Sequence, residues 1–254
     1  MSIISLNFFI FFFIIMTIYY LIPGKVQWIW LLLVSLFFYA YHVDIIQTII
    51  FIAIIMINYC LTIASEKQEK NKKKIYCISL ILDIFLLSLF KYNGFVFDIL
   101  KSCGLNNLSP IFDGISAHLS RFEPLHISYF ALILIGYITD VYWGKSSAQK
   151  NPGKMLLFCS YFPIMTSGPI VRYNQLENQL FSEYKIKFSY EKVVRGLERI
   201  AYGLFKKLVI SSRAAVIANN IHDNYFVYTG FYVPIGVTFY IIQLYMDFYV
   251  YLYC

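Results

Sequence analysis

Charged residues are scarce in this sequence, and their scarcity excludes an ordinary soluble domain. Asp, Glu, Lys and Arg make up 14% of the 254 residues, and hydrophobic residues make up 59%. Soluble domains contain about 25% charged residues. A soluble core of this length cannot bury so much apolar surface, so most of the chain needs lipid around it. The apolar runs are continuous rather than alternating, which excludes a transmembrane β-barrel and predicts helices.

The sequence also lacks the short motifs of soluble enzymes and metal sites. It has no Gly-rich nucleotide loop, no paired Cys-x-x-Cys, no His-Glu-x-x-His and no Gly-x-Ser-x-Gly. Its 5 cysteines show no metal-ligand spacing, and cysteines in apolar runs are typical of reduced core residues. We therefore predict no metal site and no bound cofactor.

Six apolar segments are predicted to span the membrane, at residues 2–22, 26–41, 45–65, 75–90, 124–143 and 231–251. A helix needs about 17–25 apolar residues to cross a bilayer. The first segment has neither the basic flank nor the cleavage site of a signal peptide, so we expect it to be retained.

Basic residues predict how these spans are oriented. The run at 66–74 is the densest basic cluster of the chain, and such clusters mark cytoplasmic loops. Counting back through three spans places the N-terminus outside. This topology explains the net charge of +7, so we expect a multi-pass protein of a bacterial plasma membrane and no nucleic-acid partner.

The segment 155–170 is apolar but broken, and it predicts a re-entrant loop. Its first dozen residues are too few to cross a hydrocarbon core of roughly 30 Å. Pro163, Gly168 and Pro169 interrupt the helical hydrogen bonds. Such backbone is tolerated at membrane depth only when protein covers it or when it lines a wet cavity. The alternative is a kinked helix end that serves packing alone.

Two predicted spans contain polar residues that call for partners inside the protein. Asp83 falls near the middle of the fourth span, where a carboxylate is costly and either has a function or is a hydrogen-bonded structural residue. A polar face of the last span carries Gly236, Tyr240, Gln243 and Asp247 at helical spacing, and we expect that face to point into the bundle.

The segment 191–213 has an apolar stripe and a basic stripe at helical spacing. A basic amphipathic helix of this kind lies in the headgroup plane of an anionic leaflet. A docking face for an acidic soluble partner uses the same residues and is the alternative.

Five segments in a fixed order resemble the membrane-bound O-acyltransferase family, in particular its bacterial branch of alginate O-acetylation and D-alanyl-transfer proteins. They are Phe90-Lys91-Tyr92-Asn93; residues 124–128 with Asp140-Val141-Tyr142 and Gly144; Tyr161-Phe162-Pro163 with residues 168–173; Gly203-Leu204-Phe205-Lys206-Lys207; and residues 240–248.

The resemblance implies a multi-helix disc with a tunnel through its thin centre. An acyl donor, either a thioester carrier protein or coenzyme A, reaches the tunnel from the cytoplasm as a co-substrate. A hydroxyl of an extracellular polysaccharide or wall polymer reaches it from outside, and a histidine acts as general base on that hydroxyl. The transferred group is expected to be acetyl. The tunnel residues expected from the matching positions and the polar face are Ser167, Gly168, Pro169, Arg172, Gln243 and Asp247.

The match is incomplete at three places. His126 stands where the family usually has glycine, and Ile133 stands where it often has glutamine. The family also continues after Asp247-Phe248 with a Ser-Gly-Tyr-like run, further helices and the catalytic histidine, whereas this sequence has residues 249–254. None of the 4 histidines, which are His42, His118, His126 and His222, falls at the position of the base.

We therefore expect the catalytic histidine beyond residue 254, a fold that is C-terminally incomplete, and no transfer by these residues alone. Arg172 is expected to bind a phosphate of the donor or to pair with Asp140, because a guanidinium suits bidentate anion recognition. A non-catalytic membrane scaffold and a transporter are the alternatives, although no inverted repeat supports a transporter.

Overall fold

The computed structural model describes residues 6–100, 102–103, 109–165, 168, 170–181 and 188–253. All regular secondary structure in these ranges is helical, which confirms the all-α class. The chain divides into two compact units. The hairpin unit comprises residues 1–12, 167–169 and 187–254, and the large unit comprises residues 13–166 and 170–186. The first helix, α1 (Leu6–Leu21), contributes residues to both.

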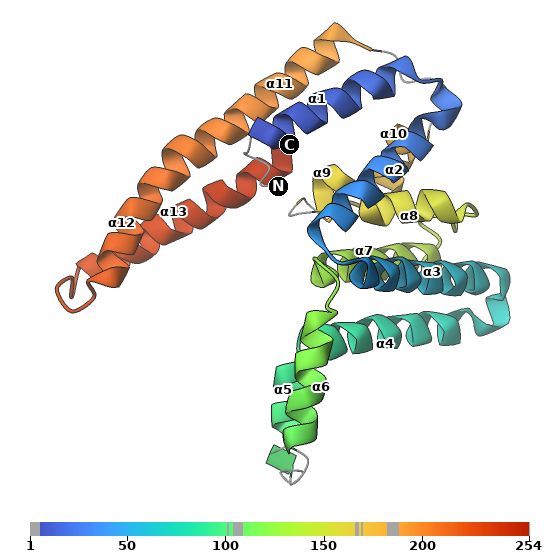
Figure 1. Cartoon of the computed structure of the whole chain (residues 1–254), viewed down its shortest axis with the longest axis horizontal. Coiled ribbons are helices and arrows are strands. Elements are labelled where there is room, and N and C mark those ends of the chain that lie inside the picture. The colour runs from blue at the N-terminus through green and yellow to red at the C-terminus, as the bar shows by residue number, and fades with distance from the viewer. Residues whose placement is uncertain are drawn as a thin grey trace. The chain divides into compact units, whose positions relative to one another are not determined.

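The large unit is built around α3, which packs against α4, α7 and α8 (Figure 1). Its helices are α2 (Gly24–His42), α3 (Ile45–Lys67), the short 3₁₀ helix η1 (Glu69–Asn71), α4 (Lys72–Phe90), α5 (Asn93–Leu100), α6 (Ser109–Arg121), α7 (Ile127–Tyr142), α8 (Pro152–Ser160), α9 (Phe162–Met165) and α10 (Tyr173–Leu180). The predicted spans from 26 to 143 all coincide with helices whose ends lie within a few residues of the predicted ones. The crossings themselves stay predictions.

Helix length and composition identify a membrane protein. Among the described residues, α2 and α3 are long and apolar enough to cross a membrane. A third span results if the run from η1 through α4 is joined to α5, although the two parts meet at an angle of 89°. The apolar helices at the first and fifth predicted spans, Asn7–Leu21 and Ile127–Tyr142, are shorter.

A buried polar network joins α3 to α4 and contains Asp83. The Asp83 side chain is only 1% exposed. Asn58 Nδ2 donates a hydrogen bond of 2.8 Å to Asp83 Oδ1, and Ser79 Oγ donates one of 2.9 Å to Asn58 Oδ1. One oxygen of Asp83 is paired in this way, as is usual for buried polar groups. Asp83 Oδ2 is buried and has no hydrogen-bond partner among the described residues, so the functional and the structural alternative for Asp83 both stay predictions.

The apolar segment predicted to be re-entrant is broken, as expected, between α8 and α9. Asn151 caps α8 by accepting hydrogen bonds from Gly153 N and Lys154 N, and the helix ends before Tyr161. The short helix α9 holds Pro163 in its first turn, where a missing N–H is tolerated. Thr166, Ser167 and Pro169 lie outside the described residues, so the re-entrant path stays a prediction.

The hairpin unit consists mainly of two antiparallel helical arms (Figure 1). The first arm runs without interruption through α11 (Tyr190–Phe205), the π-helical segment η4 (Lys206–Ser211) and α12 (Ser212–Asp223). The second arm is α13 (Tyr232–Tyr253). All three segments of the first arm pack against α13. The two arms therefore lie side by side along their length. The interfacial placement of residues 191–213 and the crossing of residues 231–251 both stay predictions.

Candidate functional site

Arg172 and Asp140 form an ion pair in the large unit, which is one of the two interactions expected for Arg172. Arg172 Nη1 lies 3.0 Å from Asp140 Oδ1 and 3.4 Å from the carbonyl oxygen of Gly136, one turn earlier on α7. The Asp140 side chain is 8% exposed, whereas the Arg172 side chain is 53% exposed. Nη1 of the guanidinium therefore binds two oxygens of α7, and the remaining N–H groups stay accessible to an anion.

The backbone of Arg172 is fixed by the start of α10. Gln175 Oε1 accepts a hydrogen bond of 3.1 Å from Arg172 N, and Gln175 N donates one of 3.0 Å to Arg172 O. This reciprocal arrangement satisfies backbone groups at a helix N-terminus. Arg172 therefore leaves the broken segment at a defined point and reaches back to α7.

The loop after α7 links the Arg172 region to α10. Lys145 N donates to Asp140 O at 2.8 Å, and Asn174 Nδ2 donates to Lys145 O at 2.7 Å. Further along the loop, Gln149 Nε2 donates to Tyr173 Oη at 2.6 Å. These bonds hold the loop, α7 and α10 together around the ion pair.

Tyr173 is a buried donor at the edge of the same region. Its hydroxyl donates to Glu177 Oε1 at 3.2 Å. Burial raises the pKa of Tyr173 above its ordinary value, so the phenol stays protonated at neutral pH. A polar pocket of about 410 Å³ adjoins this network and is lined by Glu66, Ser147, Ala148, Gln149, Lys150 and Glu177.

A second polar cluster lies between the arms of the hairpin unit and contains Gln243 and Asp247. Ser211 Oγ donates to Asp247 Oδ1 at 2.9 Å, and Lys207 Nζ lies 3.8 Å from the same oxygen. Ser211 Oγ also lies 3.3 Å from Gln243 O. Gln243 Oε1 is buried and accepts no hydrogen bond from any residue in the described ranges. An unpaired buried acceptor is costly, so this amide is suited to receive a donor from a ligand.

Local helix geometry brings Lys207 and Ser211 to this cluster. Both belong to η4. π-Helical turns are rare in proteins, and those that occur are often found at functional sites. The sequence analysis did not select either residue as a site residue. The sequence offered one indication, which is the pair Lys206-Lys207 within an otherwise apolar stretch.

The structure thus assigns the predicted residues to two clusters, each within its own unit. Arg172 belongs to the large unit, and Gln243 and Asp247 belong to the hairpin unit. Gly168 is described and belongs to the hairpin unit, and Ser167 and Pro169 lie outside the described residues.

The histidines occupy other places. His42 ends α2, and its Nδ1 lies 2.8 Å from Phe38 O. His126 precedes α7 with φ of 57°, a left-handed conformation that glycine adopts more easily, which accounts for a preference for glycine there. His118 lies on α6 and His222 on α12. In the described ranges, no group of three or more His, Cys, Asp or Glu residues is arranged to hold a metal ion.

Comparison with known proteins reveals relatives along nearly the whole chain. The probable alginate O-acetylase AlgI of Pseudomonas syringae pv. tomato is 29% identical over 251 residues, which cover 96% of this chain and 46% of that protein. The probable alginate O-acetylase AlgI of Azotobacter vinelandii is 28% identical over 96% of this chain and 48% of its own length. The peptidoglycan O-acetyltransferase of Helicobacter pylori is 29% identical over 75% of this chain and 40% of its own length.

These alignments confirm the resemblance to the membrane-bound O-acyltransferase family. The resemblance rests on the alignments and on the ordered motifs, since no family model matches the chain and no solved structure matches it significantly. The chain spans about half the length, or less, of the curated relatives it matches.

Proposed function

We propose that the chain is part of a membrane enzyme that transfers an acyl group, expected to be acetyl, to hydroxyls of an extracellular polysaccharide or wall polymer. The observation that carries the proposal is the alignment of 96% of this chain with proteins named alginate O-acetylase. A relative named peptidoglycan O-acetyltransferase supports the same reaction on a second kind of polymer.

The hairpin supports a topology in which both arms cross the membrane. The first arm extends from Tyr190 to Asp223, about 50 Å at 1.5 Å per residue, which exceeds a bilayer core of roughly 30 Å. Lys192, Arg195 and Arg199 lie at its first end, and residues 214–231 contain no Lys or Arg. Basic residues favour the cytoplasmic side, so the hairpin tip faces outside in this topology.

The ion pair of Arg172 and Asp140, with the loop after α7, is the proposed side for the acyl donor; we call it the Arg172 cluster. This loop contains Lys145 and Lys150 and is followed by Lys154 in the first turn of α8, and such basic residues favour the cytoplasmic side. Asp140 orients the guanidinium, and the donors left over recognise a phosphate of coenzyme A or of a carrier's prosthetic arm. The broken segment 155–170 then forms a re-entrant wall of the tunnel.

The second polar cluster, which contains Gln243 and Asp247, is the proposed side for the acceptor polymer. Gln243 Oε1 accepts a hydrogen bond from a sugar hydroxyl, and Asp247 is held in place by Ser211 and Lys207. The general base is a histidine outside the present 254 residues. It takes the proton of the attacking hydroxyl, whose oxygen bonds to the thioester carbonyl carbon. The carbon–sulfur bond then breaks, and the leaving thiolate regains a proton.

A hybrid enzyme tests this proposal. The aligned region of the Helicobacter pylori peptidoglycan O-acetyltransferase is replaced by the matching region of this chain, and the hybrid is expressed in a strain that lacks its own enzyme. The polymer is isolated, and its ester-bound acetate is measured. We expect acetylated polymer from the hybrid and none from these 254 residues alone.

Two controls keep the result interpretable. Immunoblotting of membranes establishes that hybrid and parent reach equal levels. The hybrid with Arg172→Ala is compared at matched membrane level, and it should lose most of the acetylation, because the donor side is impaired. A hybrid that accumulates normally but produces polymer without acetyl groups would contradict the proposed function.

A further inference from the structure

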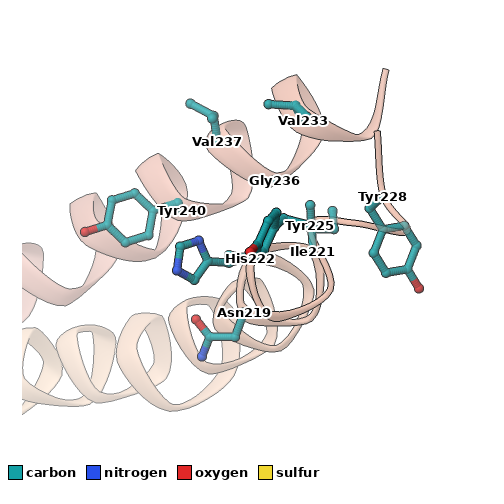
Figure 2. Close-up of a pocket in the computed structure, with 10 residues that line it drawn as sticks. Asn219, Ile221, His222, Tyr225, Tyr228, Val233, Gly236, Val237 and Tyr240 are labelled. Carbon is teal, nitrogen blue, oxygen red and sulfur yellow. The ribbon is translucent and has the colours of Figure 1, made fainter. Parts of the chain in front are cut away.

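A pocket at the tip of the hairpin is lined by residues that belong to neither polar cluster. It has a volume of about 450 Å³ and opens between the last turns of α12 and the first turns of α13. Figure 2 shows the imidazole of His222 between the two helices, with Asn219 on α12 and Tyr240 on α13. This volume lies within the range of about 300–1,000 Å³ that is usual for small-molecule sites.

A close helix contact forms the floor of this tip pocket. A Cβ atom at Gly236 would lie 2.8 Å from Ile221 Cγ2, a distance that real Cβ atoms do not tolerate. Glycine thus allows α13 to touch α12 at this level, and Tyr225 and Tyr228 of the loop between the arms also line the pocket.

The lining of the tip pocket combines aromatic rings with uncommitted polar groups. Tyr225, Tyr228 and Tyr240 supply rings, each with a hydroxyl. The Asn219 amide and the His222 imidazole make no hydrogen bond with any residue in the part of the chain that the structure describes. An aromatic surface with a few convergent polar groups suits a ligand that has apolar C–H faces and many hydroxyls.

Charge narrows the class of ligand further. No Lys, Arg, Asp or Glu lines the tip pocket, and the one charged residue within 214–231 is the acidic Asp223. A carboxylate placed here would lose water without gaining a cationic partner, which is costly. A lipid tail would leave the polar groups of Asn219 and His222 unpaired, which is also unfavourable.

We propose that the tip pocket binds an uncharged sugar unit of the acceptor polymer, such as an N-acetylhexosamine, and that it disfavours uronic acids. This inference rests on the proposed function, because that proposal places the tip of the hairpin on the outer side of the membrane. The ring face of the sugar stacks on a tyrosine, and its hydroxyl or acetamido group bonds to Asn219 and His222. The acceptor chain is then held at the outer end of the hairpin.

A binding measurement tests the inference without requiring catalysis. The full chain is placed in lipid nanodiscs, and two oligosaccharides of equal length are compared by ligand-observed NMR. One is the neutral N-acetylglucosamine tetramer, and the other is the anionic mannuronate tetramer. We expect measurable binding of the neutral tetramer and at least tenfold weaker binding of the anionic one.

Variants locate the binding. Asn219→Ala and His222→Ala should each weaken binding of the neutral tetramer about five- to tenfold, the effect of one lost hydrogen bond. Asn220→Ala is the matched control, because this neighbouring asparagine does not line the pocket, and it should leave binding unchanged. Tyr240→Leu removes a ring and should weaken binding even if one polar variant is poorly folded.

Several results would overturn the inference. They are no binding of the neutral tetramer, equal binding of both tetramers, or binding that none of the pocket variants changes. Protection of the tip pocket by lipid in a photo-crosslinking experiment with acyl-chain probes would also overturn it. Because binding is measured without transfer, a hybrid that acetylates polymer despite a negative binding result would refute only the inference and leave the proposed function intact.

Discussion

Arg172 and Asp140 are joined across 3.0 Å but are unequally buried, since the arginine side chain is 53% exposed and the aspartate side chain is 8% exposed. The pair is therefore asymmetric. Water can replace Asp140 as a partner of the guanidinium, whereas little water reaches the carboxylate if Arg172 is removed. Structural consequences of the two single substitutions should differ accordingly.

The first prediction follows from this asymmetry. Arg172→Ala should destabilise the protein by about 1–3 kcal/mol, because it leaves a buried carboxylate without its donor. Asp140→Asn retains an acceptor oxygen and should cost less than about 1 kcal/mol. Thermal unfolding of the purified chain in detergent measures both. Equal losses for the two variants would mean that the carboxylate is well solvated.

The second prediction concerns the buried network of α3 and α4. Ser79→Ala should cost about 1–2 kcal/mol, because it removes the donor to Asn58 Oδ1 in a site without exposed surface. Ser88→Ala is the matched control on the same helix, since its exposed hydroxyl bonds only to Ile84 O of its own helix, and it should have little effect. Unfolding in detergent distinguishes them, and a difference within error would contradict the structural role of the network.

The third prediction compares two helical glycines. A Cβ atom at Gly196 would meet no neighbouring heavy atom within 4 Å. Gly196→Ala should therefore stabilise α11 by about 0.5–1 kcal/mol, because alanine has the higher helix propensity. Gly236→Ala makes the same change but drives a methyl group into Ile221, and it should destabilise the hairpin. Adding Ile221→Ala should restore part of the loss. Stabilisation by Gly236→Ala would show that the arms are not in contact there.

The fourth prediction concerns membrane topology. Single cysteines at positions 154 and 172, introduced into a cysteine-free variant, should both be labelled from the cytoplasmic side, because the segment between them dips and returns. A single cysteine at position 227, in the exposed tip loop, should be labelled from outside. Labelling of positions 154 and 172 from opposite sides would make the segment an ordinary crossing and remove the physical basis of the re-entrant wall.

The sequence predicted the helices well where one strong signal dominates. Continuous apolar runs predicted α2, α3 and α4, and the proline-broken pattern predicted the break at Tyr161. On the polar face of α13, Gly236 packs on Ile221 and Asp247 accepts a hydrogen bond from Ser211, whereas Tyr240 is 55% exposed, so a bundle interior for the whole face stays a prediction. In each case the residue types alone restrict the backbone or the facing surface.

Sequence reasoning is least informative where geometry depends on a partner. The stripe at 191–213 indicated a helix at a lipid surface, but an amphipathic pattern does not reveal whether lipid or another helix covers the apolar face. In the structure α13 packs along this arm, while two leucines of the stripe, Leu197 and Leu208, are 46% and 55% exposed. The π-helical register of η4, which turns Lys207 and Ser211 toward Asp247, likewise has no signature in a single sequence.

The acetyl content of polymer made by the hybrid acetylase tests the central claim most directly. The account predicts ester-bound acetate in the hybrid's polymer, and strongly reduced acetate when Arg172 is replaced by alanine at equal membrane level. Unacetylated polymer from a hybrid that accumulates normally would contradict the assignment of this chain to an O-acyltransferase.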